Sequence, residues 1–217
     1  MFSNKKLLIF DLDGTLCDTL PDLTDSVNFS LRKYELPTKS LEFVKNAIGN
    51  GVEILISRVI ENGFDNPLYK DVFQIFRTHY LHNYKNKTVP YPNTKETLIK
   101  LKEKGYLLSV CTNKLHEAAL EIIDQFFPNI FDFVLGSKPS LKKKPSPEMI
   151  EHILDKLNIS KEDTLYIGDT NVDYEVATNS GVDYILVSYG YRKKDLLIEL
   201  DRRSVVVDRI EQLLDKF

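Results

Sequence analysis

The chain has 217 residues, of which 42% are hydrophobic and 28% are charged. This composition is too apolar for a disordered chain and too interrupted for a fibre, and the length suits one domain or one domain with a smaller insertion. The 29 Lys and Arg residues nearly balance the 32 Asp and Glu residues, so the formal charge is only -3. We therefore expect neither a basic surface for nucleic acid nor an acidic tail.

The sequence also argues against export and a membrane location. No apolar run is long enough to cross a bilayer. Near the start, the apolar run Leu7–Phe10 is interrupted by Asp11, whereas a secretory signal needs a longer apolar region and a cleavage site of small residues. Cys17 and Cys111 cannot form a disulfide framework and lack metal-site spacing, which leaves a single bridge as the alternative to free thiols. We expect a cytoplasmic protein without a membrane partner.

The first predicted element is a short buried strand at 6–10, which ends abruptly at the polar segment Asp11-Leu12-Asp13-Gly14-Thr15. Over 20–84 the pattern changes, because apolar residues recur there at spacings of three and four. Glycines and prolines interrupt this block, among them Gly49 and Gly51. The pattern predicts several helices with no strand between them.

After residue 92, short apolar runs alternate with helical segments. Predicted strands lie at 107–111, 133–135, 164–167, 184–187 and 205–207, and predicted helices at 94–104, 115–127, 147–157 and 173–179, with one more at the C-terminus. This alternation predicts an α/β fold with a mostly parallel sheet covered on both faces. Because the helical block falls between the first strand and the rest, it is an insertion. We expect a core domain at 1–16 and 88–217 and a helical domain at 17–87, with hinges at 15–21 and 85–92.

Polar residues follow three of the predicted strands, at the edge of an open parallel sheet where ligands bind. They are Asp11 and Asp13, then Thr112 and Asn113, then Asp169 and Asp173. Clustered carboxylates repel one another unless a cation neutralises them. Hard oxygen ligands without Cys or His favour Mg²⁺, and a metal beside a free carboxylate suits phosphoryl transfer.

Four motifs in this order resemble those of the haloacid dehalogenase superfamily along nearly the whole chain. They are Asp11-Leu12-Asp13-Gly14-Thr15, Thr112, Lys144-Pro145-Ser146-Pro147 and Gly168-Asp169-Thr170-Asn171-Val172-Asp173. The helical insertion is similar to the family's small α-helical cap beside its Rossmann-like core. Within the superfamily, Gly49-Asn50-Gly51 before an apolar helix and Tyr189-Gly190-Tyr191 look most like the phosphoglycolate phosphatases.

The resemblance implies a Mg²⁺-dependent phosphatase that works through an aspartyl-phosphate. Asp11 would attack phosphorus, and Asp13 would act first as general acid and then as general base. The resemblance assigns the metal to Asp11, the backbone carbonyl of Asp13, and Asp169, with Asp173 binding directly or through a water. Because the superfamily's dehalogenases lack an acid at this place, Asp13 argues against carbon–halogen chemistry.

The resemblance also implies a phosphate site made by Gly14, Thr112, Asn113 and Lys144, in which the ammonium of Lys144 would keep Asp11 ionised. In the cap, Asn50 is a candidate substrate contact, and Lys45 and Arg58 are further candidates on polarity and position alone. The expected partner is a small phosphorylated metabolite of the phosphoglycolate kind, bound by a monomer or weak homodimer.

Simpler interpretations of the same residues stay open at this point. Asp11 and Asp13 could form a turn at the end of a strand, and Thr112, Asn113 and Asp173 could cap helices. A neighbouring lysine could serve in place of Lys144, and Gly49-Asn50-Gly51 could be a plain turn between helices. The functional alternatives are a β-phosphoglucomutase-like phosphotransferase, an inorganic pyrophosphatase on the same scaffold, or an inactive relative with a regulatory or binding role.

Overall fold

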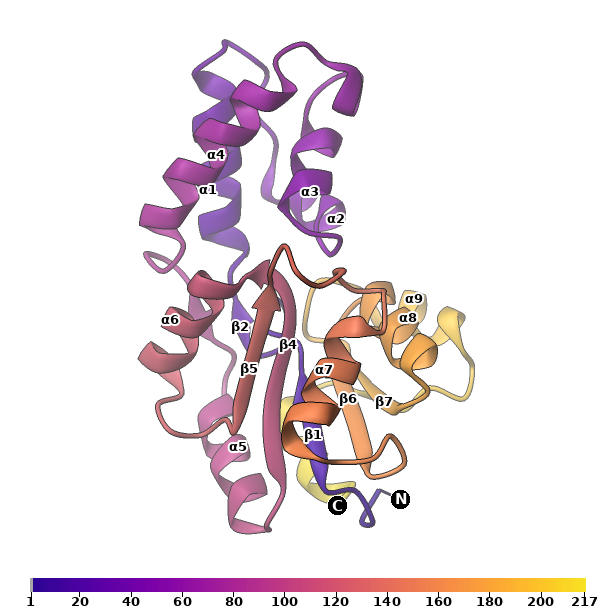
Figure 1. Ribbon diagram of the computed structural model, residues 1–217. Helices are drawn as coiled ribbons and strands as arrows, with labels where there is room; N and C mark the ends of the chain where they lie inside the picture. Colours follow the sequence, from indigo (N-terminus) through magenta and orange to yellow (C-terminus); the bar gives the residue numbers. More distant parts are fainter. Residues whose placement is uncertain (1) are drawn as a thin grey trace. The chain divides into compact units, whose positions relative to one another are not determined.

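The computed structural model describes residues 2–217 and divides them into two compact units (Figure 1). The first unit is the chain up to Cys17 together with Pro90–Phe217, and the second is Asp18–Val89. The short strands β2 (Cys17–Asp18) and β3 (Val89–Pro90) pair with each other where the chain passes from one unit to the other. In residues 2–217 no helix is both long enough and apolar enough to span a membrane.

A six-stranded parallel sheet forms the centre of the first unit, with the strand order β5-β4-β1-β6-β7-β8. The strands are β1 (Leu7–Phe10), β4 (Leu107–Leu115), β5 (Phe133–Ser137), β6 (Thr164–Gly168), β7 (Asp183–Val187) and β8 (Val206–Val207). The inner strand β1 pairs with β4 and β6, so that Leu7 lies opposite both Leu107 and Thr164. The carboxyl ends of these three strands therefore meet at one edge, and the α/β fold predicted from the sequence is confirmed.

Helices cover both faces of this sheet, which explains why its inner strands are continuous apolar runs. The helices are α5 (Thr94–Glu103), α6 (His116–Phe126), α7 (Glu148–Leu157), α8 (Asn171–Ser180), α9 (Lys194–Leu200) and the 3₁₀ helix η2 (Ile210–Asp215). On one face Leu7 and Ile9 of β1 pack with Ile153 of α7 and Val176 of α8. The alternate residue Phe10 is also fully buried, and its ring meets that of Phe131 edge-on at 6.3 Å.

The second unit is helical, as the spacing of its apolar residues predicts. It contains α1 (Leu20–Arg32), α2 (Leu41–Ala47), α3 (Val52–Val59), the 3₁₀ helix η1 (Gly63–Asp65) and α4 (Tyr69–Asn83). Helices α1 and α4 pack along each other, and α2 and α3 complete the unit. Leu31 of α1 and Phe76 of α4 are buried in this packing.

Several details of the first unit differ from the sequence prediction. Strand β4 continues to Leu115 instead of ending at 111, with an irregular register after Cys111, so Thr112 and Asn113 lie within this strand and do not follow it. Helix α9 was not expected: of its seven residues only Leu197 is buried, while Leu196 and Ile198 are exposed, so its apolar face is too narrow to produce a clear helical period. The expected C-terminal helix is the 3₁₀ helix η2. Helix α8 begins at Asn171 rather than at Asp173, because Thr170 is its N-cap and Asp173 accepts the backbone N–H of Thr170.

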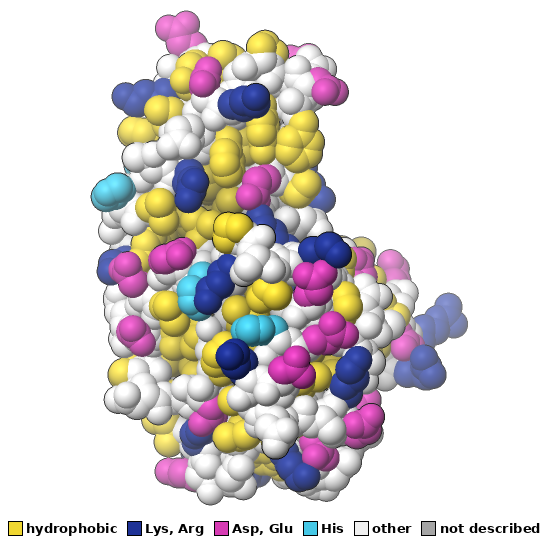
Figure 2. All heavy atoms as spheres, viewed as in Figure 1, with side chains coloured by type: hydrophobic (Ala, Val, Ile, Leu, Met, Phe, Trp, Pro, Cys, Tyr) yellow, Lys and Arg dark blue, Asp and Glu magenta, His cyan; other side chains and the backbone are white. Residues whose placement is uncertain are grey.

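The surface carries charges of both signs. Figure 2 shows Lys and Arg side chains interspersed with Asp and Glu over the visible face, with apolar side chains between them. Among the exposed apolar residues are Phe43 and Phe64 of the second unit. Cys17 and Cys111 are both buried and neither is in a disulfide, so the single bridge that the sequence left open does not form.

Candidate active site

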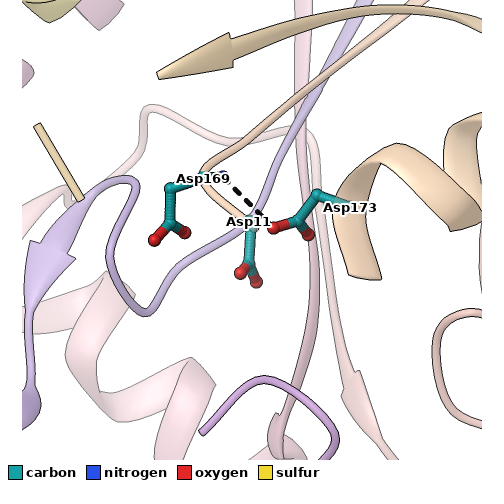
Figure 3. Close-up of side chains that lie close together, drawn as sticks. All are labelled: Asp11, Asp169 and Asp173. Carbon is teal, nitrogen blue, oxygen red and sulfur yellow. Dashed lines mark hydrogen bonds between the residues drawn. The ribbon is translucent and has the colours of Figure 1, made fainter. Parts of the chain in front are cut away.

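Three carboxylates meet at the carboxyl edge of the sheet, and Figure 3 shows them turned toward a common space. Asp11 follows β1, Asp169 follows β6, and Asp173 lies in the first turn of α8. One carboxylate oxygen from each lies within 4.8 Å of the others, and all three residues are buried. The topology therefore brings together carboxylates expected to bind metal from two separate segments of the sequence, one after β1 and one after β6.

Asp11 is held in a position that leaves its charge poorly compensated. Its backbone N–H donates to the carbonyl of Ile167 (2.9 Å), which fixes the end of β1 against β6. Its Oδ1 lies 3.0 Å from Nζ of Lys144, yet within the described residues this buried oxygen accepts no hydrogen bond. Burial raises the pKa of Asp11 to about 7; the Lys144 ammonium opposes this rise, whereas Asp173 and Asp13 add to it.

Asp169 is fully buried and is oriented by the loop that follows β1 and by the loop that follows β7. The Thr15 hydroxyl donates to its Oδ1 (3.1 Å), and the Tyr191 N–H donates to its Oδ2 (2.7 Å). Burial raises the pKa of Asp169 well above its usual range, and the charges of Asp173 and Asp11 raise it further. Asp169 and Asp11 can therefore both be ionised only when a cation lies beside them.

Two glycines make room for the Asp169 carboxylate. Gly14 has a φ of +87°, and a Cβ built on it would collide with all three carboxylate atoms of Asp169. A Cβ on Gly190 would collide with the Gly14 carbonyl oxygen and with the Asp169 side chain. Because Gly14 has no side chain, it leaves the space that the Asp169 carboxylate occupies.

The segment Tyr189-Gly190-Tyr191, which the sequence identified only as a family resemblance, contacts either the loop after β1 or the Asp169 side chain at each residue. The Tyr189 hydroxyl donates to the Thr15 carbonyl (2.9 Å), Gly190 packs on Gly14 and Asp169, and Tyr191 donates its N–H to Asp169. The segment therefore holds Oδ2 of Asp169 in place, and the Thr15 hydroxyl holds Oδ1. No local sequence pattern links it to Asp11.

Asp173 is saturated by donors from this chain. Its Oδ2 accepts from the N–H of Asp169 (3.1 Å), the N–H of Thr170 (2.9 Å) and the Thr170 hydroxyl (2.7 Å), and its Oδ1 accepts from Lys144 Nζ (2.8 Å). Burial raises the pKa of Asp173, but the Lys144 ammonium and the hydrogen bonds from Lys144 and Thr170 outweigh it and lower the pKa. In these contacts Asp173 holds Lys144 and the Asp169 backbone and takes part in the N-cap of α8, which was one of the simpler interpretations of this residue. Its expected binding to the metal, directly or through a water, stays a prediction.

Lys144 is the lysine of the run 142–144 that enters the site. Its side chain is 2% exposed, and its Nζ forms ion pairs with Asp11 (3.0 Å) and Asp173 (2.8 Å) and donates to the Tyr166 hydroxyl (2.8 Å). Burial by itself lowers the pKa of this ammonium, but Asp11 and Asp173 outweigh burial and raise it, so Lys144 is cationic. By contrast, Lys142 is exposed and pairs with Glu148.

Asn113 positions Lys144 through both ends of its side-chain amide. Its Nδ2 donates to the Lys144 carbonyl (3.0 Å), and its Oδ1 accepts the Lys144 N–H (2.9 Å). The structure places this side chain on the Lys144 backbone, and the phosphate contact that the resemblance implies for it stays a prediction. Thr112 lies beside it at the end of β4 and is buried, and its hydroxyl oxygen accepts the N–H of Lys114 (3.3 Å).

Two residues of the site were missed by the sequence analysis. Lys114 is buried, and its Nζ lies 3.0 Å from Oδ1 of Asp13. Tyr166 of β6 places its hydroxyl within 3.1 Å of Asp173 Oδ1 and 3.0 Å of the Cys111 carbonyl. Lys114 follows Thr112 and Asn113 at the end of a strand, so its position was a usable signal. Tyr166 lies inside a strand, where the sequence cannot distinguish a core tyrosine from a functional one.

Asn50 belongs to the second unit, where it is part of the turn between α2 and α3. Arg58 donates to Asn50 Oδ1 (3.0 Å) and to the Ala47 carbonyl (2.7 Å), so its guanidinium holds this turn together. Gly49 and Gly51 both have positive φ, at +120° and +88°. These contacts meet the description of an interhelical turn, and Lys45 lies in the last turn of α2 before it.

The charges of the site fit a divalent cation. The four carboxylates of Asp11, Asp13, Asp169 and Asp173 exceed the two ammonium groups of Lys114 and Lys144 by two negative charges. Asp11 also presents a buried oxygen without a hydrogen bond. Carboxylate oxygens are hard ligands, which suit Mg²⁺ or a similar ion. The residues present therefore fit the metal site that the sequence predicted.

The comparisons with known proteins agree with this geometry. The model of the haloacid dehalogenase-like hydrolase family matches residues 8–187. The phosphoglycolate phosphatase of Haemophilus influenzae is 36% identical over 217 residues, covering 96% of each chain, and that of Aliivibrio fischeri is 31% identical, covering 99% of this chain and 97% of that protein.

Solved structures extend the same likeness. A predicted phosphoglycolate phosphatase from Haemophilus somnus superposes with a TM-score of 0.89 at 31% identity, covering 98% of each chain. A haloacid dehalogenase-like hydrolase from Streptococcus pneumoniae has the same fold, with a TM-score of 0.89 at 20% identity and 99% coverage of each chain. The chain therefore belongs to the haloacid dehalogenase-like hydrolase family, and it is a phosphatase, an enzyme of the phosphoric monoester hydrolase class.

Proposed function

We propose that the protein is a Mg²⁺-dependent phosphatase that hydrolyses a small phosphomonoester of the phosphoglycolate kind through an aspartyl-phosphate on Asp11. The observation that carries this proposal is the meeting of Asp11 with Asp169 and Lys144 at the carboxyl edge of the sheet. The choice of substrate rests on the relatives that are named phosphoglycolate phosphatases. Cytoplasmic location and a monomeric or weakly dimeric state stay predictions from the sequence.

In the first step an oxygen of Asp11 forms a bond to phosphorus while the bond from phosphorus to the ester oxygen breaks. Asp13 gives its proton to the departing oxygen, so the leaving group departs as an alcohol. Lys144 holds the carboxylate of Asp11 and would neutralise a phosphoryl oxygen, and the Thr112 hydroxyl would donate to another. Asp11, Asp169 and the backbone carbonyl of Asp13 would hold Mg²⁺, which would supply positive charge for the phosphoryl oxygens.

In the second step a water molecule forms a bond to phosphorus while the bond to the Asp11 oxygen breaks. Asp13, which is now a carboxylate, takes a proton from that water, so the step releases inorganic phosphate and restores both aspartates. The ionised state of Asp11 depends on the cations around it, because burial raises its pKa to about 7. Lys144 is held against Asp11 by Asp173 and Asn113, and its position is therefore fixed before substrate binds.

The decisive experiment measures phosphate release over a panel of 2-phosphoglycolate, pyrophosphate, nucleotides and sugar phosphates, with Mg²⁺ and with EDTA. We expect Mg²⁺-dependent release with preference for 2-phosphoglycolate. Asp11→Asn should abolish turnover, and the matched control Asp124→Asn, at an exposed position of α6, should retain it. Full activity of Asp11→Asn would refute the assignment of the nucleophile.

The same panel tests the functional alternatives. Isomerisation of a sugar phosphate without net phosphate release would favour a β-phosphoglucomutase-like activity, and preferred cleavage of pyrophosphate would favour a pyrophosphatase. Mg²⁺ binding without turnover of any compound would favour a regulatory or binding role. The presence of Asp11, Asp13, Lys144 and Asp169 supports an active enzyme over this last alternative.

A further inference from the structure

Lys114 contributes a second buried ammonium to the site, at a position distinct from that of Lys144. Its side chain is 2% exposed, and its Nζ lies 3.0 Å from Oδ1 of Asp13, whose side chain is 21% exposed. The Nζ of Lys144, by contrast, contacts Asp11, Asp173 and Tyr166. Lys144 therefore contacts Asp11, the proposed nucleophile, whereas Lys114 contacts Asp13, the proposed general acid.

The position of Asp13 determines which part of a substrate would lie near Lys114. This step rests on the proposed function, in which Asp13 must reach the ester oxygen in order to protonate it. Atoms of the leaving group one or two bonds from that oxygen then lie next to the Asp13 carboxyl. Because Lys114 Nζ lies 3.0 Å from Oδ1 of that carboxyl, it would lie near the same leaving-group atoms.

A buried ammonium at this point has a chemical preference. An uncharged leaving group cannot form an ion pair with this ammonium, whereas a carboxylate close to the ester oxygen both accepts its hydrogen bond and pairs with its charge. We propose that Lys114 is a specificity-determining residue that binds a carboxylate on the leaving group. The preferred substrate class is then the phosphate ester of a small 2-hydroxy acid, in which the carboxylate and the ester oxygen are attached to the same carbon.

The test compares two substrates of similar size that differ in this charge: 2-phosphoglycolate and 2-hydroxyethyl phosphate. For the wild-type protein we expect a higher kcat/KM for 2-phosphoglycolate. Lys114→Met should lower kcat/KM for 2-phosphoglycolate roughly 10- to 100-fold, mainly by raising KM, because a charge-assisted hydrogen bond is lost. On 2-hydroxyethyl phosphate the same variant should lose clearly less of its kcat/KM, because the ion pair with Asp13 is lost there too but no bond to a substrate carboxylate is lost. Lys114→Arg, which keeps the charge, should recover part of the preference.

The outcome that overturns the inference is an equal loss on both substrates, because Lys114 would then act only by positioning Asp13. A binding measurement makes the result independent of turnover and of the proposed chemistry. In the Asp11→Asn background, calorimetry with Mg²⁺ should give tighter binding of 2-phosphoglycolate than of 2-hydroxyethyl phosphate, and Lys114→Met should remove this difference. Equal binding of the two compounds before the substitution would also overturn the inference. If Lys114→Met does not fold, Lys114→Gln provides the same comparison.

Discussion

At the scale of single residues, the candidate site depends on side chains that fix other side chains. Asn113 uses both its donor and its acceptor on the Lys144 backbone, and Asp173 uses both its oxygens on Lys144, Thr170 and the Asp169 N–H. Catalysis by charge requires that the charged groups are held in place before the substrate arrives. We therefore expect substitutions at these supporting residues to affect kcat as well as stability.

Asn113→Ala tests this dependence. It removes both hydrogen bonds to Lys144 and leaves a buried N–H without a partner, so we expect a destabilisation of about 1–3 kcal/mol. Because the Lys144 ammonium then loses its fixed position, kcat should fall by about 10-fold or more. The control is Asn179→Ala, which removes the bond from an exposed Asn179 Nδ2 to the neighbouring Pro145 carbonyl (2.9 Å). If the two variants lose the same small amount of activity, Asn113 has no positioning role.

A comparison of Gly14 with Gly105 distinguishes the effect of backbone strain from that of side-chain crowding. Gly14 has φ +87° and Gly105 has φ +92°, but a Cβ would collide with Asp169 only at Gly14, since nothing lies within 4 Å of a Cβ at Gly105. Alanine at either position should cost about 1–3 kcal/mol of unfolding free energy from the left-handed backbone. Only Gly14→Ala should also abolish Mg²⁺-dependent phosphate release, because the Asp169 carboxylate must move. Full activity in Gly14→Ala would contradict the assigned crowding.

At the scale of elements, Asp22 in the first turn of α1 ties this helix to the segment that follows α4. Asp22 is buried, with 2% of the residue exposed. Its carboxylate accepts hydrogen bonds from the N–H of Lys87 (3.0 Å), the N–H of Thr88 (2.9 Å) and the Thr88 hydroxyl (2.9 Å). These hydrogen bonds join residues more than sixty positions apart, close to the two points where the chain enters and leaves the helical unit. Asp22 therefore links the beginning of the helical unit to its end.

We expect Asp22→Ala to lower the unfolding free energy of the second unit by about 3 kcal/mol, since it leaves buried donors without a partner. The matched control is Asp25→Ala. Asp25 also contacts Lys87, but through an exposed ion pair of 2.6 Å between Nζ and Oδ2, which contributes at most about 1 kcal/mol. Urea unfolding followed by circular dichroism measures both variants. Equal effects would show that the buried carboxylate does not link the two ends of the unit.

How much the sequence predicts depends on whether a feature is local. The strands around β1 were predicted because a strand buried on both faces is a continuous apolar run, and Asp11 and Asp169 follow from where such runs stop. Helix α9 was missed because only Leu197 is buried. The partner of the Asn113 amide could not be predicted, because its bonds reach Lys144, 31 residues away. Nor could the contact between Lys114 and Asp13, which are 101 residues apart.

At the scale of the whole molecule, a metal that binds the folded state alone adds to its stability. Asp11 and Asp169 come from separate segments that meet only in the fold, so the unfolded chain offers no comparable site. Mg²⁺ in excess of its dissociation constant should raise Tm, and at a hundredfold excess the gain is about 2.7 kcal/mol. Differential scanning fluorimetry with and without Mg²⁺ measures this gain. Asp169→Asn should remove it, whereas Asp124→Asn, at an exposed position, should keep it.

The size of this stabilisation should depend on pH, and the sign follows from Asp11. In the metal-free fold burial raises its pKa from 3.8 to about 7, so between about pH 4 and pH 7 the folded state binds more protons than the unfolded chain. For this carboxyl, the contribution to metal-free stability is therefore greatest at low pH and declines as pH rises to 7. Mg²⁺ must displace that proton below pH 7 and meets an ionised carboxylate above it. The rise in Tm produced by Mg²⁺ should thus be larger at pH 8 than at pH 5.5. An equal rise at both values would mean that the ion binds away from Asp11.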